Sequence, residues 1–303
     1  MFFKKLFYKV TNKEKYNEYK VNLEREKRLK WYKSGYQNQI IDIQKKIDNK
    51  KELNFLHGGQ LGDIVDSLAL IKKLSETHKC KLYLDVDNKN KSLKFKNHVG
   101  KAFLNDKMVN MLMPLLKKQS FIDSVNIHKG EDIDINLNLF REIHTKMNMS
   151  STRWYFYITG VHADLSLPYL FVEQHKKIKN KITIIRSMRR NSIFINYKFL
   201  NNYKDLLFIG LESEFKLLKD QIPNLDFYNC ENFLEMAEII RSSKFFLGNI
   251  TFGYCIAEAM KVPRLLECSH DGDLAAIHPS GQNAYDFFFQ EHFEKWFDYL
   301  YNL

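Results

Sequence analysis

Short apolar runs alternate with amphipathic stretches from residue 52 to the end of the chain. The run at 53–57 ends at two glycines and is typical of a buried strand, and from residue 63 apolar positions recur at helical spacing. The same pattern predicts strands at 81–87, 124–128 and 132–139 and a helix at 108–119. Because short strands that alternate with helices form parallel βαβ units, this half predicts one Rossmann-like domain.

The second half repeats the pattern after a charged stretch at 173–181, which we interpret as a linker. Its elements are predicted as strands at 181–186, 205–210, 225–229, 244–249 and 262–267, helices at 213–222, 233–243 and 252–261, and a C-terminal helix at 285–303. The sequence therefore predicts an α/β fold of two Rossmann-like domains, 51–172 and 173–303, with parallel sheets facing a central cleft.

Residues 1–50 form a distinct basic segment. Their apolar positions recur at loosely helical spacing, which predicts one or two amphipathic helices. One interpretation is a solvated helical extension that packs on the main body. The other is a peripheral contact with an anionic membrane surface through Phe2, Phe3, Leu6 and Phe7.

The 303 residues carry a net charge of +11, which favours anionic partners such as phosphorylated ligands or an acidic membrane face. No nucleic-acid-binding signature accompanies this charge, so we expect no specific nucleic-acid partner. The four cysteines lack CxxC spacing, which indicates reduced thiols and predicts neither a metal nor another cofactor. No signal peptide and no apolar run of ~20 residues is evident, which predicts a cytoplasmic protein with the inner membrane face as a further option.

A glycine-rich turn, HGGQLGD at 57–63, joins the first predicted strand to its helix. Gly58, Gly59 and Gly62 would let the backbone approach a ligand closely, and a helix start favours anions. Three interpretations stay open: a dinucleotide-binding fingerprint, a helix cap formed by Asp63, and a general base at Asp63 that acts on a sugar hydroxyl.

Two stretches of the second half could hold a nucleotide diphosphate. The basic loop after the strand at 181–186 offers arginines, whose guanidinium groups pair with phosphate through two hydrogen bonds. The start of the helix at 252–261 offers free amides, small residues and a carboxylate within reach of a ribose. A solvated basic loop and an exposed helix carboxylate are the plainer alternatives. The predicted donor-binding residues are Arg186, Ser187, Arg189, Gly210, Asn249, Thr251, Gly253 and Glu258.

Two motifs resemble a known family. GGQLGDIVDSLALIKKL resembles the first loop and helix of the ADP-heptose:lipopolysaccharide heptosyltransferases, in which the aspartate that matches Asp63 is the proposed base. FLEMAEIIRSSKFFLGNITFGYCIAEAMKVPRLLE resembles the donor-binding region of the same GT-B enzymes. Its AEAMKVP portion is also similar to the helix of retaining GT-B enzymes, whose ribose-binding glutamate matches Glu258.

This resemblance implies a metal-independent glycosyltransferase of glycan or lipopolysaccharide biosynthesis. The enzyme would move a sugar from a nucleotide-diphosphate donor to a glycan or glycolipid hydroxyl, with inversion and with Asp63 as the general base. Ile250, Thr251 and Phe252 stand where the family has Asp-Ser/Thr-Gly. A non-catalytic binding protein on the same fold and a nucleotide-sugar epimerase therefore stay open as alternatives.

Overall fold

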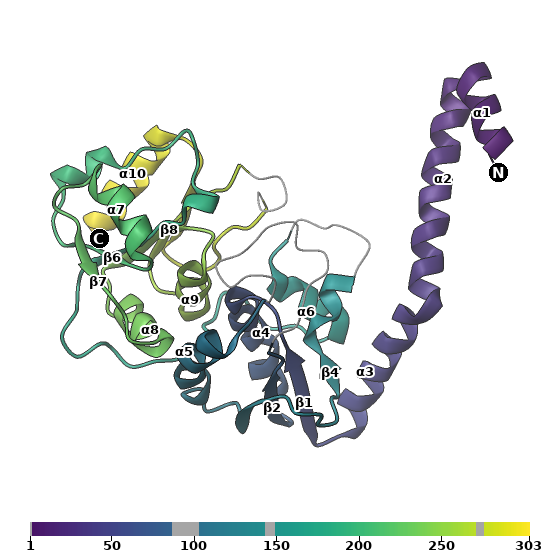
Figure 1. Cartoon of the computed structure of the whole chain (residues 1–303), viewed down its shortest axis with the longest axis horizontal. Coiled ribbons are helices and arrows are strands. Elements are labelled where there is room, and N and C mark those ends of the chain that lie inside the picture. The colour runs from purple at the N-terminus through teal and green to yellow at the C-terminus, as the bar shows by residue number, and fades with distance from the viewer. Residues whose placement is uncertain (1, 87–102, 143–148, 271–275) are drawn as a thin grey trace.

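Two separate parallel β-sheets form the body of the molecule, in a computed structural model that describes residues 2–86, 103–142, 149–270 and 276–303 (Figure 1). The first sheet has the strand order β3-β2-β1-β4, and the second has the order β10-β9-β8-β5-β6-β7. The strands of the described residues pair in parallel in both sheets. The predicted α/β fold with two parallel sheets is confirmed.

The first lobe is built around β1, whose alternate side chains Leu53 and Phe55 are fully buried. Its elements are β1 (Glu52–His57), α4 (Leu61–Leu74), β2 (Lys79–Leu84), α5 (Asp106–Lys117), β3 (Ser124–Ile127), β4 (Ile135–Asn136), the 3-10 helix η2 (Leu137–Glu142) and α6 (Ser151–Thr159). Helix α4 is apolar around most of its circumference because it contacts both α6 and the second lobe.

The second lobe is built around β5 and β8, which are buried along their whole length. Its elements are β5 (Ile182–Ile185), the 3-10 helices η3 (Met188–Arg190) and η4 (Lys198–Asn202), β6 (Leu206–Ile209), α7 (Glu212–Lys219), β7 (Asp226–Tyr228), α8 (Phe233–Arg241), β8 (Phe245–Asn249), α9 (Phe252–Met260), β9 (Arg264–Glu267), β10 (Ala284–Phe287) and α10 (Gln290–Tyr301). Aromatic rings of α10 cover the outer face of the sheet, where Phe293 stacks on Phe287 with their ring centroids 4.1 Å apart.

Helices from each lobe meet along the boundary between them: α4 packs on α9, and α5 packs on α8 (Figure 1). The first turns of α4 and α9 touch each other. A Cβ atom at Gly62 would lie 2.9 Å from the Cys255 sulfur, so glycine allows these two helices to touch. Buried apolar side chains of both lobes form one continuous cluster across this boundary.

The N-terminal helices form an arm that extends away from the two lobes (Figure 1). The arm consists of α1 (Phe2–Thr11), α2 (Lys13–Trp31), the π-helical turn η1 (Tyr32–Tyr36) and α3 (Gln37–Asn49), which confirms the predicted helical character of this segment. Among the side chains of the arm that the structure describes, the buried ones are Ile43 and Ile47 of α3, whereas α2 has no buried residue. Within the described residues, no helix is both long and apolar enough to cross a membrane.

The predicted strand at 132–139 is wrong over most of its length. Pairing with β1 stops after Asn136, because the Asn136 side chain accepts a hydrogen bond from the Asn138 backbone at 3.0 Å and turns the chain into η2. Asn138 in turn accepts a hydrogen bond from the Gly58 amide at 3.0 Å. The Asn136 and Asn138 side chains therefore bind backbone amides and end this strand.

Two further differences concern aromatic stretches. The aromatic-rich stretch after residue 150, to which the sequence analysis assigned no element, forms helix α6, which Ser150 caps through the Thr152 amide. The predicted C-terminal helix at 285–303 begins only at Gln290, because the residues before it extend the second sheet as β10. Aromatic residues suit both strands and helices, so composition alone did not separate the two elements.

Candidate active site

A cavity of about 630 Å³ lies between the two lobes. The first lobe contributes the first turn and a half of α4 and the start of α6. The second lobe contributes the first two turns of α9, two arginines at the end of η3, and the loop that leads into β10. Because the first turns of α4 and α9 both border the cavity, free amide groups from two helices are available to an anionic ligand.

A buried hydrogen-bond chain holds the glycine-rich turn in place. Nδ1 of His57 accepts a hydrogen bond from the Gly59 amide at 2.9 Å, so Nε2 carries the proton and donates to the Tyr155 hydroxyl at 2.8 Å. Tyr155 donates in turn to the backbone carbonyl of Asp63 at 3.0 Å. Burial lowers the pKa of His57 from 6.5 to about 3, which keeps this imidazole neutral.

Asp63 lies in the first turn of α4 and borders the cavity. Gln60 occupies the N-cap position, so the interpretation of Asp63 as the helix cap is wrong. The Asp63 carboxylate instead pairs with Arg141, whose guanidinium packs over the Phe103 and Phe140 rings at 4.2 and 4.5 Å from their centroids. Both members of the pair are 23% exposed, so the carboxylate is oriented yet remains accessible from the cavity.

A second carboxylate, Asp66, lies one turn further along α4 and also borders the cavity. Its side chain accepts a hydrogen bond from the Ser151 hydroxyl at 2.6 Å. Burial, together with the negative charge of Asp63, raises the pKa of Asp66 from 3.8 to about 7. Asp66 is not among the residues predicted from the sequence, although its i+3 spacing from Asp63 places both on one helix face.

The start of α9 faces these carboxylates from the second lobe. Thr251 caps the helix by accepting a hydrogen bond from the Tyr254 amide at 3.3 Å, and Thr251 borders the cavity. Gly253 is not among the described residues that line the cavity. A Cβ atom there would collide with the Ile185 side chain, so Gly253 permits close packing of α9 on β5.

Comparison with solved structures finds the same architecture at low sequence identity. The glycosyl transferase family 9 protein from Veillonella parvula matches with a TM-score of 0.50 and 10% identity, over 82% of this chain and 89% of that chain. The E. coli heptosyltransferase WaaC with ADP matches with a TM-score of 0.54 and 8% identity, over 82% of this chain and 99% of that chain. No protein-family model and no curated protein matches the sequence.

The chain has the GT-B fold of the heptosyltransferases. At these identities the likeness concerns the arrangement of two parallel-sheet lobes around a cleft, and the resemblance inferred from the two sequence motifs is confirmed at that level. The GT-B fold places the carboxyl ends of the central strands of both sheets beside the cavity, where ligands bind in open α/β sheets. The roles of individual residues rest on their own contacts.

Arg186, predicted to hold a diphosphate, is a framework residue of this GT-B fold. Its guanidinium donates to both carboxylate oxygens of Glu267, at 2.7 and 2.8 Å, and packs over the Tyr197 ring. Arg186 is only 9% exposed and does not appear among the described cavity-lining residues. The predicted donor contact from Arg186 is therefore not supported, because its hydrogen-bonding groups already have a buried partner.

Ser187, Asn249 and Gly210 also belong to the framework. The Asn249 side chain is fully buried, accepts a hydrogen bond from the Ser187 amide at 3.0 Å and donates to the Ser187 carbonyl at 2.8 Å. Gly210 follows β6 with a φ of +147° and lies against Phe208. None of the three lines the cavity, as far as the structure describes it.

Arg189, Thr251 and Glu258 are the predicted donor-binding residues that do border the cavity. The Glu258 carboxylate is already engaged: it pairs with Lys261 and with the buried Arg264, and it accepts a hydrogen bond from the Ser280 hydroxyl at 2.8 Å. Arg189 therefore stands out as a cavity-lining cation of the second lobe, beside the helix start that Thr251 caps.

Proposed function

We propose that the protein is a glycosyltransferase that moves a sugar from a nucleotide-diphosphate donor to the hydroxyl of a glycan or glycolipid. One observation carries the proposal: a single cavity of a GT-B fold is bordered by Asp63 from one lobe and by Arg189 and the α9 start from the other. A carboxylate and an anion-binding surface that face each other suit the transfer of a group away from a diphosphate.

In the proposed reaction, the Asp63 carboxylate accepts the proton of the acceptor hydroxyl while that oxygen attacks the anomeric carbon of the donor. The bond between this carbon and the diphosphate oxygen breaks, and its electron pair leaves with the diphosphate. Arg189 and the free amides of α9 stabilise the resulting negative charge. Attack from the face opposite the leaving group inverts the anomeric centre, and no metal takes part in these steps.

Arg141 positions the proposed base. Its guanidinium pairs with the Asp63 carboxylate, and its own place is set by the two aromatic rings beneath it. The His57–Tyr155 chain fixes the Asp63 backbone from the other side. Two independent sets of contacts therefore hold the carboxylate at the cavity wall, as a general base requires.

Substitution of Asp63 tests this function. Asp63→Asn keeps the size of the side chain but cannot accept the acceptor proton, so we expect donor turnover to fall by about 10²–10⁴-fold while nucleotide-diphosphate binding persists. The matched control is Asp106→Asn, an exposed aspartate in the first turn of α5. If Asp63→Asn turned over the donor as fast as the control variant does, Asp63 would not be the general base.

A non-catalytic binding protein is the second candidate, and one observation favours it. The Arg186 and Glu258 side chains, which could hold a donor, both have partners within the protein. Under this function, nucleoside diphosphates would leave the thermal midpoint of the protein unchanged, and no nucleotide-sugar would be turned over with any glycan acceptor. Turnover of a nucleotide-sugar that is lost in Asp63→Asn would exclude the non-catalytic protein.

We further propose that α1 contacts an anionic membrane surface where a glycolipid acceptor would lie. Its exposed apolar residues follow i, i+3, i+4, i+7 spacing: Phe3, Leu6, Phe7 and Val10. Lysines at the same end of the arm would attract acidic headgroups. The cytoplasmic face of the membrane, predicted from the sequence, stays a prediction.

Vesicle binding tests the membrane contact. Full-length protein should sediment with vesicles that contain phosphatidylglycerol and far less with neutral phosphatidylcholine vesicles. Leu6→Glu places a charge on the apolar stripe and should abolish sedimentation, whereas Leu217→Glu, at an exposed leucine of α7, should not. Equal sedimentation of the two variants would contradict the proposal.

A further inference from the structure

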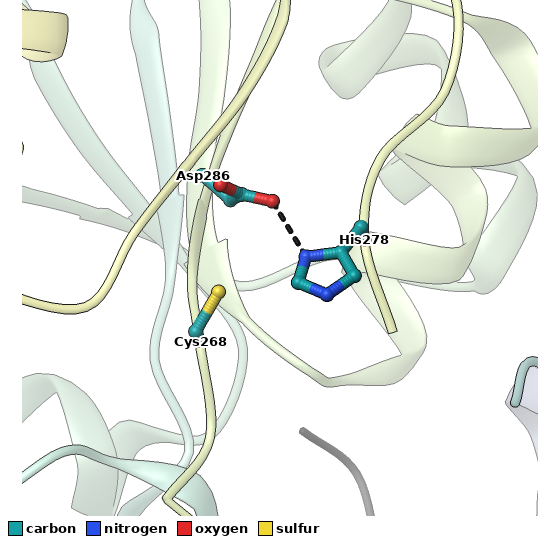
Figure 2. A group of neighbouring side chains, drawn as sticks. All are labelled: Cys268, His278 and Asp286. Carbon is teal, nitrogen blue, oxygen red and sulfur yellow. Dashed lines mark hydrogen bonds and ion pairs between the residues drawn. The ribbon is translucent and has the colours of Figure 1, made fainter. Parts of the chain in front are cut away.

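Three side chains with metal-ligating atoms meet at the edge of the second sheet, apart from the proposed reacting groups. Sγ of Cys268, a ring nitrogen of His278 and a carboxylate oxygen of Asp286 all lie within 4.8 Å of one another. Figure 2 shows the three side chains directed toward a common point, with Nδ1 of His278 2.7 Å from the Asp286 carboxylate.

The sheet register fixes two of the three positions. Asp286 pairs with Leu266 in the β9–β10 ladder, and Cys268 follows Leu266 by two residues. The Cys268 amide continues the ladder by donating to the Phe287 carbonyl at 2.9 Å. Because paired residues and residues two apart point to the same face of a sheet, Cys268 and Asp286 are held side by side.

His278 supplies the third atom from the loop that leads into β10. This loop is tied down shortly afterwards, where the Ser280 hydroxyl lies within hydrogen-bond distance of two acceptors, the Glu258 carboxylate at 2.8 Å and the Leu165 carbonyl at 3.0 Å. The imidazole is about half exposed and also borders the cavity between the lobes. An ion can therefore reach the three side chains from solvent.

We propose that Cys268, His278 and Asp286 bind one zinc ion. Thiolate, imidazole and carboxylate are the three protein ligands that zinc takes, with bond lengths of about 2.3, 2.0 and 2.1 Å. In a tetrahedral site such bonds place neighbouring ligand atoms roughly 3.3–3.8 Å apart, so shifts of about 1 Å from the present positions suffice. The soft thiolate favours zinc over magnesium or calcium.

Zinc would take the place of the hydrogen between Nδ1 of His278 and the Asp286 carboxylate, with the neutral imidazole carrying its proton on Nε2, and the Cys268 thiol would release its proton to solvent. Three protein ligands leave a fourth position for water. The ion would join the end of β9, β10 and the residues around His278, and thereby hold Ser280 at the cavity wall. This inference does not depend on the proposed transfer reaction.

Metal titration of the full chain tests the site. After treatment with a chelator, the protein should bind one zinc ion per chain in competition with a chromophoric chelator. Cys268→Ser and Asp286→Asn should each weaken binding by at least about tenfold, because each removes one of three ligands. Two variants at residues outside the cluster serve as controls, Cys230→Ser and His292→Ala, and both should bind like the unchanged protein.

Cobalt gives a second readout that does not depend on stability. Cobalt bound by the unchanged protein should show the visible bands of a tetrahedral site and a thiolate-to-cobalt absorption, and Cys268→Ser should lose the thiolate absorption. The proposal is overturned if zinc does not bind, if Cys230→Ser abolishes binding, or if Cys268→Ser retains the thiolate absorption. Circular dichroism confirms that each variant is folded.

Discussion

The charge state of single buried side chains decides how the cavity wall holds together. His57 ends β1 and Asp66 lies in the second turn of α4, and burial shifts the pKa of both side chains. For the imidazole, burial favours the neutral form and preserves its acceptor nitrogen for the Gly59 amide. For the carboxylate, burial favours the protonated form, so the two residues give the protein opposite dependences on pH.

Acid should destabilise the protein through His57. Its pKa falls from 6.5 in the unfolded chain to about 3 in the fold, so its contribution is complete above pH 6.5 and is lost as the pH falls toward 3. Between pH 7 and pH 4.5 the free energy of unfolding should fall for the unchanged protein. We expect the fall to be smaller for His57→Gln, by more than about 1 kcal/mol. Urea unfolding at both pH values measures this difference. The exposed His292→Gln should behave like the unchanged protein.

A rise in pH toward neutrality should destabilise the protein through Asp66. Because its pKa rises from 3.8 unfolded to about 7 folded, the fold binds a proton that the unfolded chain releases, and stability falls as the pH rises from about 4 to 7. We expect Asp66→Asn to be more stable than the unchanged protein at pH 8, by more than about 1 kcal/mol, with a smaller gain at pH 5. Thermal unfolding checks this, and Asp106→Asn is the matched control. An equal gain at both pH values would contradict the raised pKa.

At the scale of elements, the contact between α4 and α9 sets the distance between the lobes. Gly62 lies against the Cys255 sulfur, and Gly253 lets α9 pack on β5. The helices that carry the cavity-lining residues therefore meet through small residues. The sequence indicated glycines for ligand approach; Gly62 does border the cavity as well as touching α9, whereas Gly253 serves the packing of α9 on β5.

Substitution at Gly62 should reveal this contact. Gly62→Ala would place a Cβ atom 2.9 Å from the Cys255 sulfur and should destabilise the protein by roughly 1–2 kcal/mol. In a Cys255→Ala background the same change should be neutral or stabilising, because alanine is the better helix former. Chemical denaturation of the four proteins of this double-mutant cycle gives the coupling energy, which we expect to exceed about 1 kcal/mol. A coupling near zero would place the two residues out of contact.

For the whole molecule, one continuous core joins the two lobes, while the N-terminal arm stands apart (Figure 1). The boundary between fold and arm lies at α3, since Ile43 and Ile47 are buried and none of the fully described residues of α2 is. Helix α2 can reach outward because none of its described side chains is buried.

Truncation should separate the two parts. Removal of residues 1–31 should change the thermal midpoint by no more than about 2 °C, because α2 buries no side chain against the lobes. Removal of residues 1–49 also deletes Ile43 and Ile47 and should lower the midpoint by several degrees. Differential scanning calorimetry compares the two. A large loss with the shorter deletion would show that the arm supports the fold.

The sequence by itself determined the elements and the fold class of this protein. Apolar periodicity and turn residues are local properties, so most strands and helices could be predicted, as could the glycine-rich turn and the aspartate at its end. The prediction of a strand at 132–139 was wrong because asparagine side chains there accept hydrogen bonds from backbone amides. Apolar periodicity does not reveal such contacts.

Tertiary structure alone decided which of the predicted side chains are free to act. Arg186 and Glu267 are far apart in sequence, yet they form a buried ion pair that takes this arginine away from the cavity. Cys268, His278 and Asp286 converge only because β9 and β10 are neighbours in the sheet. A residue type specifies the chemistry that a side chain can perform, whereas its partners, which long-range packing supplies, determine whether that chemistry is still available.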